Sequence, residues 1–287
     1  MYILDTSAIR GISSANLKLA ATKFDIAVPT VSVLELASHL NDSPNDDDYS
    51  RARGNLVKCK MAQILDDPFW LLSQRIQSSA NPTRKEDRAV LGQLIAAAEQ
   101  SQTLAELETK ILSYPDGAIA SCRDIGKGIG KILKEEEDSF VAHIKSLPAL
   151  AKLDLSLNGK HCLSSAEFLE QLLAATLSLS GTSDKDVQIR TFLATAPYFG
   201  YLIHRMYQYA NRLQPGAAEL LVDQNDCEDA YTSLCLDLHG EDILVTNDRG
   251  TLAALRNTFT LLNEVIPLSI DSYRVMSNEE FLHAIEP

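Results

Sequence analysis

Two short apolar runs, one near each end of the chain, are each followed by an aspartate. Residues 1–4 (MYIL) precede Asp5, and residues 243–245 (ILV) shortly precede Asp248. Runs of this length and composition predict buried parallel strands, and the sites of open α/β sheets lie at the carboxyl ends of such strands. A carboxylate at the border of a buried run is costly unless it is paired or bound to a cation. The two runs therefore indicate an α/β fold with acids at one edge of its sheet.

Two predicted helices carry further acids. Residues 30–40 predict a helix that holds Glu35 among apolar neighbours. A second helix, predicted over 226–239, places Asp226 and Asp229 on one face of its first turn. Several converging carboxylates form an oxygen-rich cage that suits Mg²⁺ or Mn²⁺. The pattern therefore indicates metal-dependent phosphodiester chemistry.

Helix capping and turn formation are the simpler explanations of each acid taken alone. Asp5 suits the cap of a following turn, and Asp248 suits a strand-to-helix turn. The S-x-x-E spacing that ends at Glu35 and the N-x-x-E spacing that ends at Glu228 both fit capping boxes. These explanations treat the acids singly and do not account for the order in which they follow one another.

The pattern of the middle of the chain predicts helices almost throughout. They are expected at 51–65, 84–112, 116–146, 164–180 and 186–213. Breaker-rich stretches at 41–48 and 214–216 bound this segment. We therefore expect a discontinuous α/β domain, residues 1–48 and 219–287, interrupted by an all-α insertion at 49–218.

The two terminal blocks carry the predicted strands and shorter helices. In the first block we expect strands at 1–4 and 26–29 and helices at 14–23 and 30–40. In the second block we expect helices at 226–239, 250–257 and 277–285, a strand at 241–246 and an edge strand at 265–270. This alternation is typical of a small parallel sheet flanked by helices.

Charge is distributed unevenly between these two parts. The chain has a net charge of −13, which argues at first against a nucleic-acid ligand. Residues 1–48 and 219–287 hold 21 acids and 6 Lys or Arg, whereas residues 49–218 hold 18 acids and 20 Lys or Arg. The acidity therefore belongs to the blocks with the predicted site, and the middle is mildly basic. If the partner is a polyanion, the middle segment is the part expected to bind it.

Two groups of basic residues are the candidates for nucleic-acid binding. The first is a stripe at helical spacing, Arg123, Lys127, Lys131 and Lys134. The second is a smaller cluster, Arg84, Lys85 and Arg88. A solvated helix face beside the acidic run 135–138 is the simpler explanation of the stripe, and a similar explanation applies to the cluster.

Cysteine usage and hydropathy favour a cytoplasmic protein. The five cysteines are odd in number and form no CxxC pair, which fits reduced thiols without a zinc module. No apolar run reaches the roughly 18 residues of a membrane helix, and no basic leader precedes the first predicted strand. We therefore expect no membrane partner.

The four acidic motifs, in the order strand, helix, helix and strand, resemble those of the PIN-domain nucleases. Residues 3–8 (ILDTSA) are similar to the family's first strand and acid, and 28–36 (VPTVSVLEL) to its second strand and following helix. Residues 229–240 and 244–248 (LVTND) are similar to its third and fourth motifs. The chain departs from compact members by the long segment between the second and third acids.

The resemblance implies a PIN-like three-layer fold and a metal-dependent endoribonuclease. Such an enzyme hydrolyses phosphodiester bonds of single-stranded or structured RNA with Mg²⁺ or Mn²⁺ and leaves 5′-phosphate and 3′-hydroxyl ends. The implied catalytic and metal-binding acids are Asp5, Glu35, Asp229 and Asp248. Asp226 is a further candidate metal ligand, and the choice between it and Asp229 as the third ligand stays open. The side chains expected to orient carboxylates or phosphate are Thr6, Ser7, Thr246 and Asn247.

Other functions share this pattern. A PIN scaffold can serve as a binding or assembly module without catalysis, or as a structure-specific DNA nuclease. Many family members are toxins held by an inhibitor protein, so an antitoxin-like partner is open here, as is a homodimer. The number of metal ions, one or two, is open as well.

Overall fold

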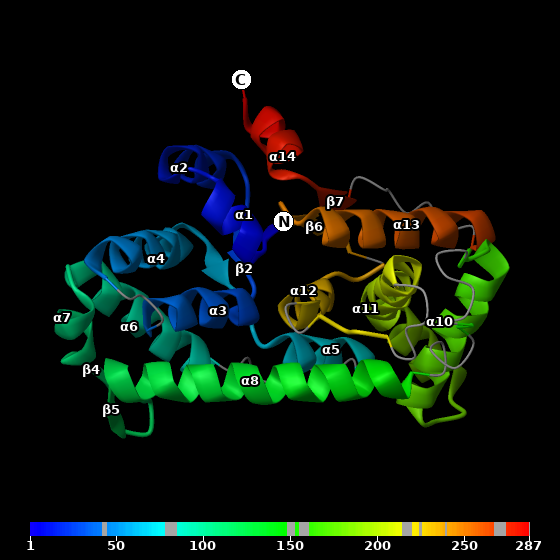
Figure 1. Cartoon of the computed structure of the whole chain (residues 1–287), viewed down its shortest axis with the longest axis horizontal. Coiled ribbons are helices and arrows are strands. Elements are labelled where there is room, and N and C mark those ends of the chain that lie inside the picture. Colours follow the sequence, from blue (N-terminus) through cyan, green and yellow to red (C-terminus); the bar gives the residue numbers. More distant parts are fainter. Residues whose placement is uncertain are drawn as a thin grey trace.

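The chain forms a five-stranded parallel sheet flanked by helices, which places it in the α/β class (Figure 1). This computed structural model describes residues 1–41, 45–77, 85–147, 153–154, 161–213, 220–223, 226–238, 240–266 and 274–286. Within these residues, no helix combines the length and the apolar character that a membrane span requires.

The direction in which successive strands are added to the sheet reverses once, at its central strand. Its strands are β1 (Tyr2–Leu4), β2 (Ile26–Val28), β3 (Gln63–Ile64), β6 (Ile243–Val245) and β7 (Val275–Met276). They lie in the order β3-β2-β1-β6-β7, and every pair is parallel. The chain builds outward from β1 to β3 and then returns to the other side of β1. Crevices at such switch points, outside the carboxyl ends of the strands, are where open α/β sheets bind ligands.

The described residues of the terminal blocks form six helices. They are α1 (Thr6–Gly11), α2 (Ser14–Lys23), α3 (Thr30–Asn41), α12 (Asp226–Ser233), α13 (Arg249–Val265) and α14 (Asn278–Ile285). Asp5 caps α1 by accepting from the Ala8 amide, and Asp248 caps α13 by accepting from the Thr251 amide. The capping expected of these two aspartates is therefore present. It leaves one oxygen of each carboxylate outside the cap bond.

The middle segment contributes seven helices among the described residues. They are α4 (Asp46–Lys58), α5 (Pro68–Gln77), α6 (Lys85–Gln100), α7 (Leu104–Glu108), α8 (Cys122–Ser146), α10 (Ser165–Ser180) and α11 (Lys185–Arg212). A 3₁₀ turn, η1 (Cys59–Met61), follows α4. Helix α8 runs along one side of the molecule next to α3, while α11 packs against α10 and α13 (Figure 1). The middle segment therefore surrounds the sheet rather than standing apart from it.

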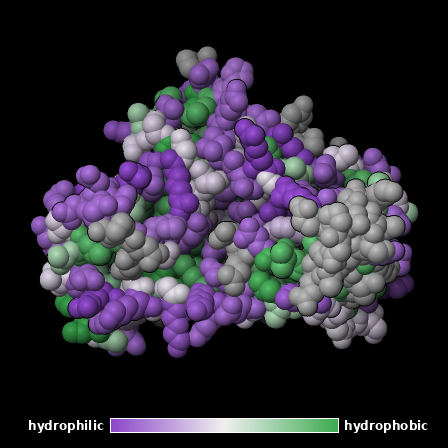
Figure 2. Space-filling model, in the orientation of Figure 1, coloured by the Kyte–Doolittle hydropathy of each residue, from purple (hydrophilic) through white to green (hydrophobic). Residues whose placement is uncertain are grey.

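The expectation of an all-α insertion is wrong. Strand β3 lies inside the middle segment and pairs with β2. Strands β4 (Ile111–Ser113) and β5 (Ile119–Ser121) form an antiparallel hairpin where continuous helices were predicted. The turn between them is built by Asp116, which accepts from the Ala118 amide at 2.9 Å, and by Gly117 at φ +88°. A P-D-G turn of this kind reverses the chain and favours a hairpin over two helices. Figure 2 shows apolar side chains at the hairpin's corner of the molecule, where Ile111 and Ile119 are exposed.

Several predicted boundaries moved for local reasons. The predicted helix at 51–65 starts earlier, at Asp46, because Asn45 caps it and three aspartates of the expected loop occupy its first turn, where the helix dipole favours acids. That helix then ends at Lys58, ahead of β3. Helix α5 lies where only turns were expected, since Pro68 suits the first position of a helix.

The second terminal block also differs from the expectation. Helix α12 ends at Ser233 rather than near Gly240, because tight i→i−3 bonds such as Cys235 N–H to Thr232 O replace the helical ones. Helix α13 continues to Val265, so the predicted edge strand at 265–270 starts inside a helix, and its residues 267–270 lie outside the described part. The edge strand is β7 instead.

Two hydrophobic cores cover the two faces of the sheet. Successive strand residues point to opposite faces, so Ile3 joins one core and Leu4 the other. The first core unites Ile3 with buried residues of α8, α10, α11 and α13, among them Phe140, Phe168, Tyr201 and Phe259. The second core unites Leu4 with residues of α3, α4, α6 and α14. The sheet and the middle helices therefore share their interiors.

Candidate functional site

Asp5 lies at the carboxyl end of β1 and is 2% exposed. Its Oδ1 accepts from the Ala8 amide at 2.6 Å, and the Ser7 hydroxyl lies 2.8 and 3.0 Å from its two oxygens. Burial and, to a smaller extent, the charge of Glu35 raise the pKa of Asp5. Hydrogen bonds to Thr246, Ala8 and Ser7 oppose the rise, and the net pKa is about 6. Asp5 is thus a buried acid at the switch point with a weakened tendency to ionise.

Hydroxyl groups join the ends of β1 and β6. The Ser7 hydroxyl accepts from the Asn247 amide at 2.7 Å and lies 3.3 Å from the Thr246 hydroxyl. The Thr246 hydroxyl in turn accepts from the Asp248 amide at 3.0 Å. Ser7 and Thr246 therefore hold Asp5 against the end of β6, as residues that orient a carboxylate would. Thr6 is buried, and the side chain of Asn247 is exposed.

Thr251 connects the other two aspartates of the site. Its hydroxyl donates to Asp229 at 2.5 Å, and its amide donates to Asp248 at 2.7 Å. Burial raises the pKa of Asp229 well above its usual range, and the charge of Asp5 raises it next most, followed by Asp248. Asp229 thus lies within electrostatic reach of both strand-end aspartates. No sequence motif pointed to Thr251, although its place three residues after Asp248 is that of a capped amide.

Glu35 lies in the second turn of α3, since that helix begins at Thr30. A capping box with Ser32 is therefore excluded. The Glu35 carboxylate is 22% exposed and lies 3.4 Å from Arg10 and 3.8 Å from His39. Its charge acts on both Asp5 and Glu228. Glu35 thus borders the site from the side of β2.

Asp226 has a cation of its own within the protein. Arg205 of α11 donates to both of its oxygens, at 2.8 Å from Nε and 2.6 Å from Nη2, and the Tyr209 hydroxyl donates to it as well. Asp226 is 4% exposed and Arg205 is 7% exposed. An arginine fork satisfies a buried carboxylate fully, so Asp226 needs no metal ion. Of the two candidates for the third acid, Asp229 is the one whose pKa the charges of Asp5 and Asp248 raise.

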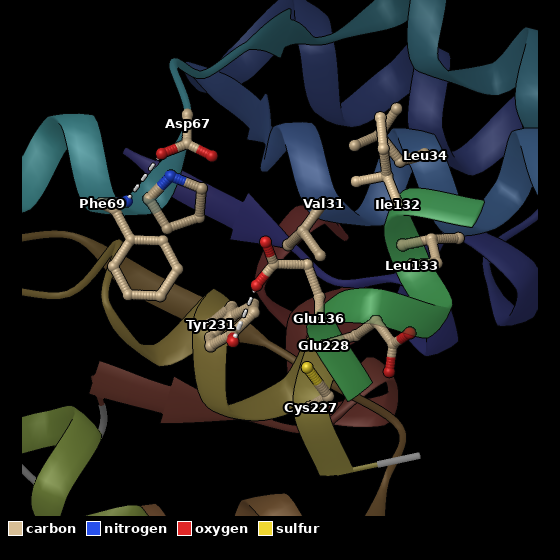
Figure 3. A pocket seen from close by; sticks show the side chains of 11 residues that line it. Val31, Leu34, Asp67, Phe69, Ile132, Leu133, Glu136, Cys227, Glu228 and Tyr231 are labelled. Atoms are coloured by element: carbon tan, nitrogen blue, oxygen red, sulfur yellow. Dashed lines mark hydrogen bonds between the residues drawn. The ribbon is translucent and has the colours of Figure 1, made fainter. Parts of the chain in front are cut away.

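Glu228 is an acid of the site that sequence reasoning assigned only to a cap. It lines a pocket between α3, α5, α8 and α12, shown in Figure 3, together with Glu136 of α8. The Tyr231 hydroxyl donates to Glu136 at 3.0 Å. Burial raises the pKa of Glu228 to about 7, and the charges of Glu35 and Glu137 add to the rise. Asp226, Glu228 and Asp229 are three acids within one helical turn, and this density was the signal that could have identified Glu228.

These acids, Asp5, Glu35, Glu228, Asp229 and Asp248, are called the carboxylate cluster below. They act on one another through their charges, but no three acids, histidines or cysteines in the described part of the chain lie close enough to hold one metal ion. The donor types are nonetheless carboxylate and hydroxyl oxygens, which Mg²⁺ and Mn²⁺ prefer. The cluster thus has the right chemistry for a hard cation without a closed cage.

The two basic groups have different surroundings. Arg123, Lys127, Lys131 and Lys134 are exposed on α8. Lys131 lies 3.7 Å from Glu135 and Arg123 lies 3.9 Å from Glu108, so the stripe is partly paired on the surface. Arg88 instead forms an ion pair with buried Asp66 at 3.0 Å, beside the end of β3. Arg84 and the side chain of Lys85 lie outside the described residues.

The raised pKa values predict a pH-dependent stability. The folded state binds protons at Asp5 and Glu228 that the unfolded chain, with ordinary values of 3.8 and 4.5, has already lost. The stabilisation of the folded state by these bound protons is complete below about pH 4, and it is lost as the pH rises through about 6 to 7. In thermal unfolding without divalent ions, Asp5→Asn should therefore stabilise the protein more at pH 7.5 than at pH 5. The exposed Asp25→Asn is the control, and an equal effect of both variants at both pH values would contradict the assignment.

Comparisons with protein-family models, with curated proteins and with solved structures found no match for this chain. The function of the carboxylate cluster is therefore inferred from its geometry and chemistry.

Proposed function

We propose that this protein is a Mg²⁺- or Mn²⁺-dependent endoribonuclease with a PIN-like catalytic domain. One observation carries the proposal: Asp5 lies at the switch point of a parallel sheet, and after burial its charge is the largest cause of the raised pKa of Asp229 on α12. Two buried like charges close together are avoided when one carboxyl stays protonated, and a bound cation would instead let both ionise. The order of the acids, at the ends of β1 and β6 and on α3 and α12, is the order that the resemblance requires.

The chain's own residues have separate tasks in this proposal. Asp5, Asp229 and Asp248, with Glu35 beside them, would hold the metal ion. Ser7 and Thr251 keep two of these carboxylates in place through their hydroxyl groups. The bound ion would supply a water of lowered pKa and stabilise the charge that develops on the leaving oxygen.

A nucleic acid is the proposed substrate because helix α8, which carries the basic stripe, packs against α3 and α12, which carry Glu35, Glu228 and Asp229. The choice of RNA follows from the resemblance. Glu136 and Glu137 of α8 lie beside the cluster. Lys127 precedes Glu136 on the same helix by about 13 Å along the helix axis, at 1.5 Å per residue. Lys127 and Lys134 are exposed and available to phosphates. The middle segment would thus bind the strand whose cleavage occurs at the sheet edge.

Cleavage of labelled RNA and DNA tests the proposal directly. Wild type should cut single-stranded RNA with Mn²⁺ or Mg²⁺, leave 5′-phosphates, and stop when EDTA is added. Asp5→Asn should lower the rate by about 100-fold or more, because it removes a ligand charge. Asp25→Asn makes the same chemical change at an exposed position of the opposite sheet edge and should leave the rate unchanged.

The remaining outcomes separate the alternatives. If wild type cuts only DNA and Asp5→Asn does not, the proposed substrate becomes DNA and the proposed metal-dependent chemistry stands. If the folded wild type cuts neither nucleic acid, and Mn²⁺ fails to raise its melting temperature, the enzyme proposal is overturned in favour of a binding or assembly module.

A further inference from the structure

A second cavity lies between the segment that precedes α10, helix α11 and helix α13, and it shares no residue with the carboxylate cluster. Its volume is about 320 Å³, which falls in the range of small-molecule pockets. The side chains that matter for its chemistry are His161, His204, Tyr207, Gln208, Asn257 and Leu261.

The described lining of this cavity carries no formal charge. It contains no Asp, Glu, Lys or Arg. Burial lowers the pKa of His204 to about 4, so its imidazole is neutral at neutral pH. An ion would have to leave water without a countercharge in the cavity, which is strongly unfavourable. The cavity therefore suits an uncharged ligand.

The same lining holds polar atoms that lack partners. His204 is only 8% exposed, and its Nε2, like that of His161, is buried without a hydrogen bond among the described residues. Leaving such an atom unsatisfied is unfavourable, so a ligand that supplies the missing partner is favoured. Gln208 uses its oxygen to accept from Arg205 at 2.7 Å, which leaves its amide N–H groups as donors. Asn257 is exposed and offers both a donor and an acceptor.

Flat and apolar surfaces complete the cavity. The ring of Tyr207 lies edge-on to His161 with centroids 6.5 Å apart, and its hydroxyl accepts from Gln171 at 3.2 Å. Leu261 adds an apolar wall from α13. Rings fixed in this way favour a planar ligand, because aromatic faces and edges pack best against flat groups.

We propose that this cavity binds an uncharged, planar heterocycle with donors and acceptors along its edge, namely a nucleobase. The base would be either part of a free nucleoside or an unpaired base of a single strand. Neutral imidazole, carboxamide and aromatic groups are the side chains that read base edges and stack on base faces. The site is independent of the proposed nuclease and would stand if no cleavage occurs.

Titration calorimetry with adenosine, guanosine, cytidine and uridine tests the proposal on wild type and on Asp5→Asn. We expect saturable binding of at least one nucleoside to both proteins. Leu261→Trp, which fills the cavity from its half-buried wall, should abolish that binding. Asn257→Ala should weaken it about tenfold, the effect of one lost hydrogen bond, whereas Asn16→Ala on α2 should not change it.

Nitrogen NMR of labelled histidine provides a readout that does not depend on a variant. The Nε2 resonance of His204 should shift when the nucleoside binds. A nucleoside that binds more tightly than a short oligonucleotide indicates a free ligand, and the reverse order indicates a base of a strand. No saturable binding to folded wild type, or binding that Leu261→Trp leaves intact, would overturn the proposal.

Discussion

Arg205→Ala is expected to lower the free energy of unfolding by about 3–5 kcal/mol. The Arg205 and Asp226 side chains are 9% and 6% exposed, and two hydrogen bonds join them. Removing the guanidinium leaves the Asp226 carboxylate buried without its cation, which is the costly way to break such a pair. Because Asp226 begins α12, the change also loosens the helix that carries Asp229.

Urea unfolding of three variants checks this expectation. Arg212→Ala removes an exposed arginine from the same helix and should change stability by less than about 0.5 kcal/mol. Adding Asp226→Asn to Arg205→Ala should recover part of the loss, because the unpaired charge is gone. A loss below about 1 kcal/mol for Arg205→Ala would show that the pair contributes little. Arg205 would then be no positioning residue for the cluster.

Phe140→Ala is expected to cost about 3–5 kcal/mol, as large-to-small changes in a full core do. Phe140 is 1% exposed, and its ring meets that of Tyr231 edge-on with centroids 6.2 Å apart. It lies in the core that also contains Ile3 of β1. The loss should therefore appear in the unfolding of the whole molecule, in one transition, rather than in the middle segment alone.

Circular dichroism and tyrosine fluorescence, followed in the same urea titration, measure this effect. Ile132→Ala, at a half-exposed position of the same helix, is the control and should have a much smaller effect. Two separate transitions, of which Phe140→Ala moves only one, would contradict the shared core. They would instead support the independent insertion that the sequence pattern predicted.

Both variants bear on the proposed function because the middle segment supports the carboxylate cluster. Helix α11 supplies Arg205 from behind α12, and the Cβ of a residue at Gly250 would lie 2.3 Å from the Arg205 Nη1. Helix α8 supplies Glu136 and Glu137 beside Glu228. Arg205, which binds Asp226 at the start of α12, thus comes from a part of the chain that carries none of the four acidic motifs, whereas Ser7, Thr246 and Thr251 come from the terminal blocks.

Local signals in the sequence are sufficient to predict several of the elements. The strands near residues 2–4, 26–28 and 243–245 follow from short apolar runs that end in polar residues. The helices at 14–23, 165–180 and 185–212 follow from apolar spacing between turn residues. Since the carboxyl ends of parallel strands meet at one edge, the same signals placed Asp5 and Asp248 at the switch point.

Features that depend on distant partners follow from how the chain packs in three dimensions. The two residues of β3 are too few to form a pattern, and they become a strand only by pairing with β2. Arg205, 21 positions before Asp226 in the chain, supplies the cation that pairs with this acid, which supports Asp229 as the third acid of the proposed site. Glu228 joined the cluster because α8 brings Glu136 and Glu137 against α12. Such contacts follow from how helices pack around a shared core, and they cannot be predicted from the local spacing of residues.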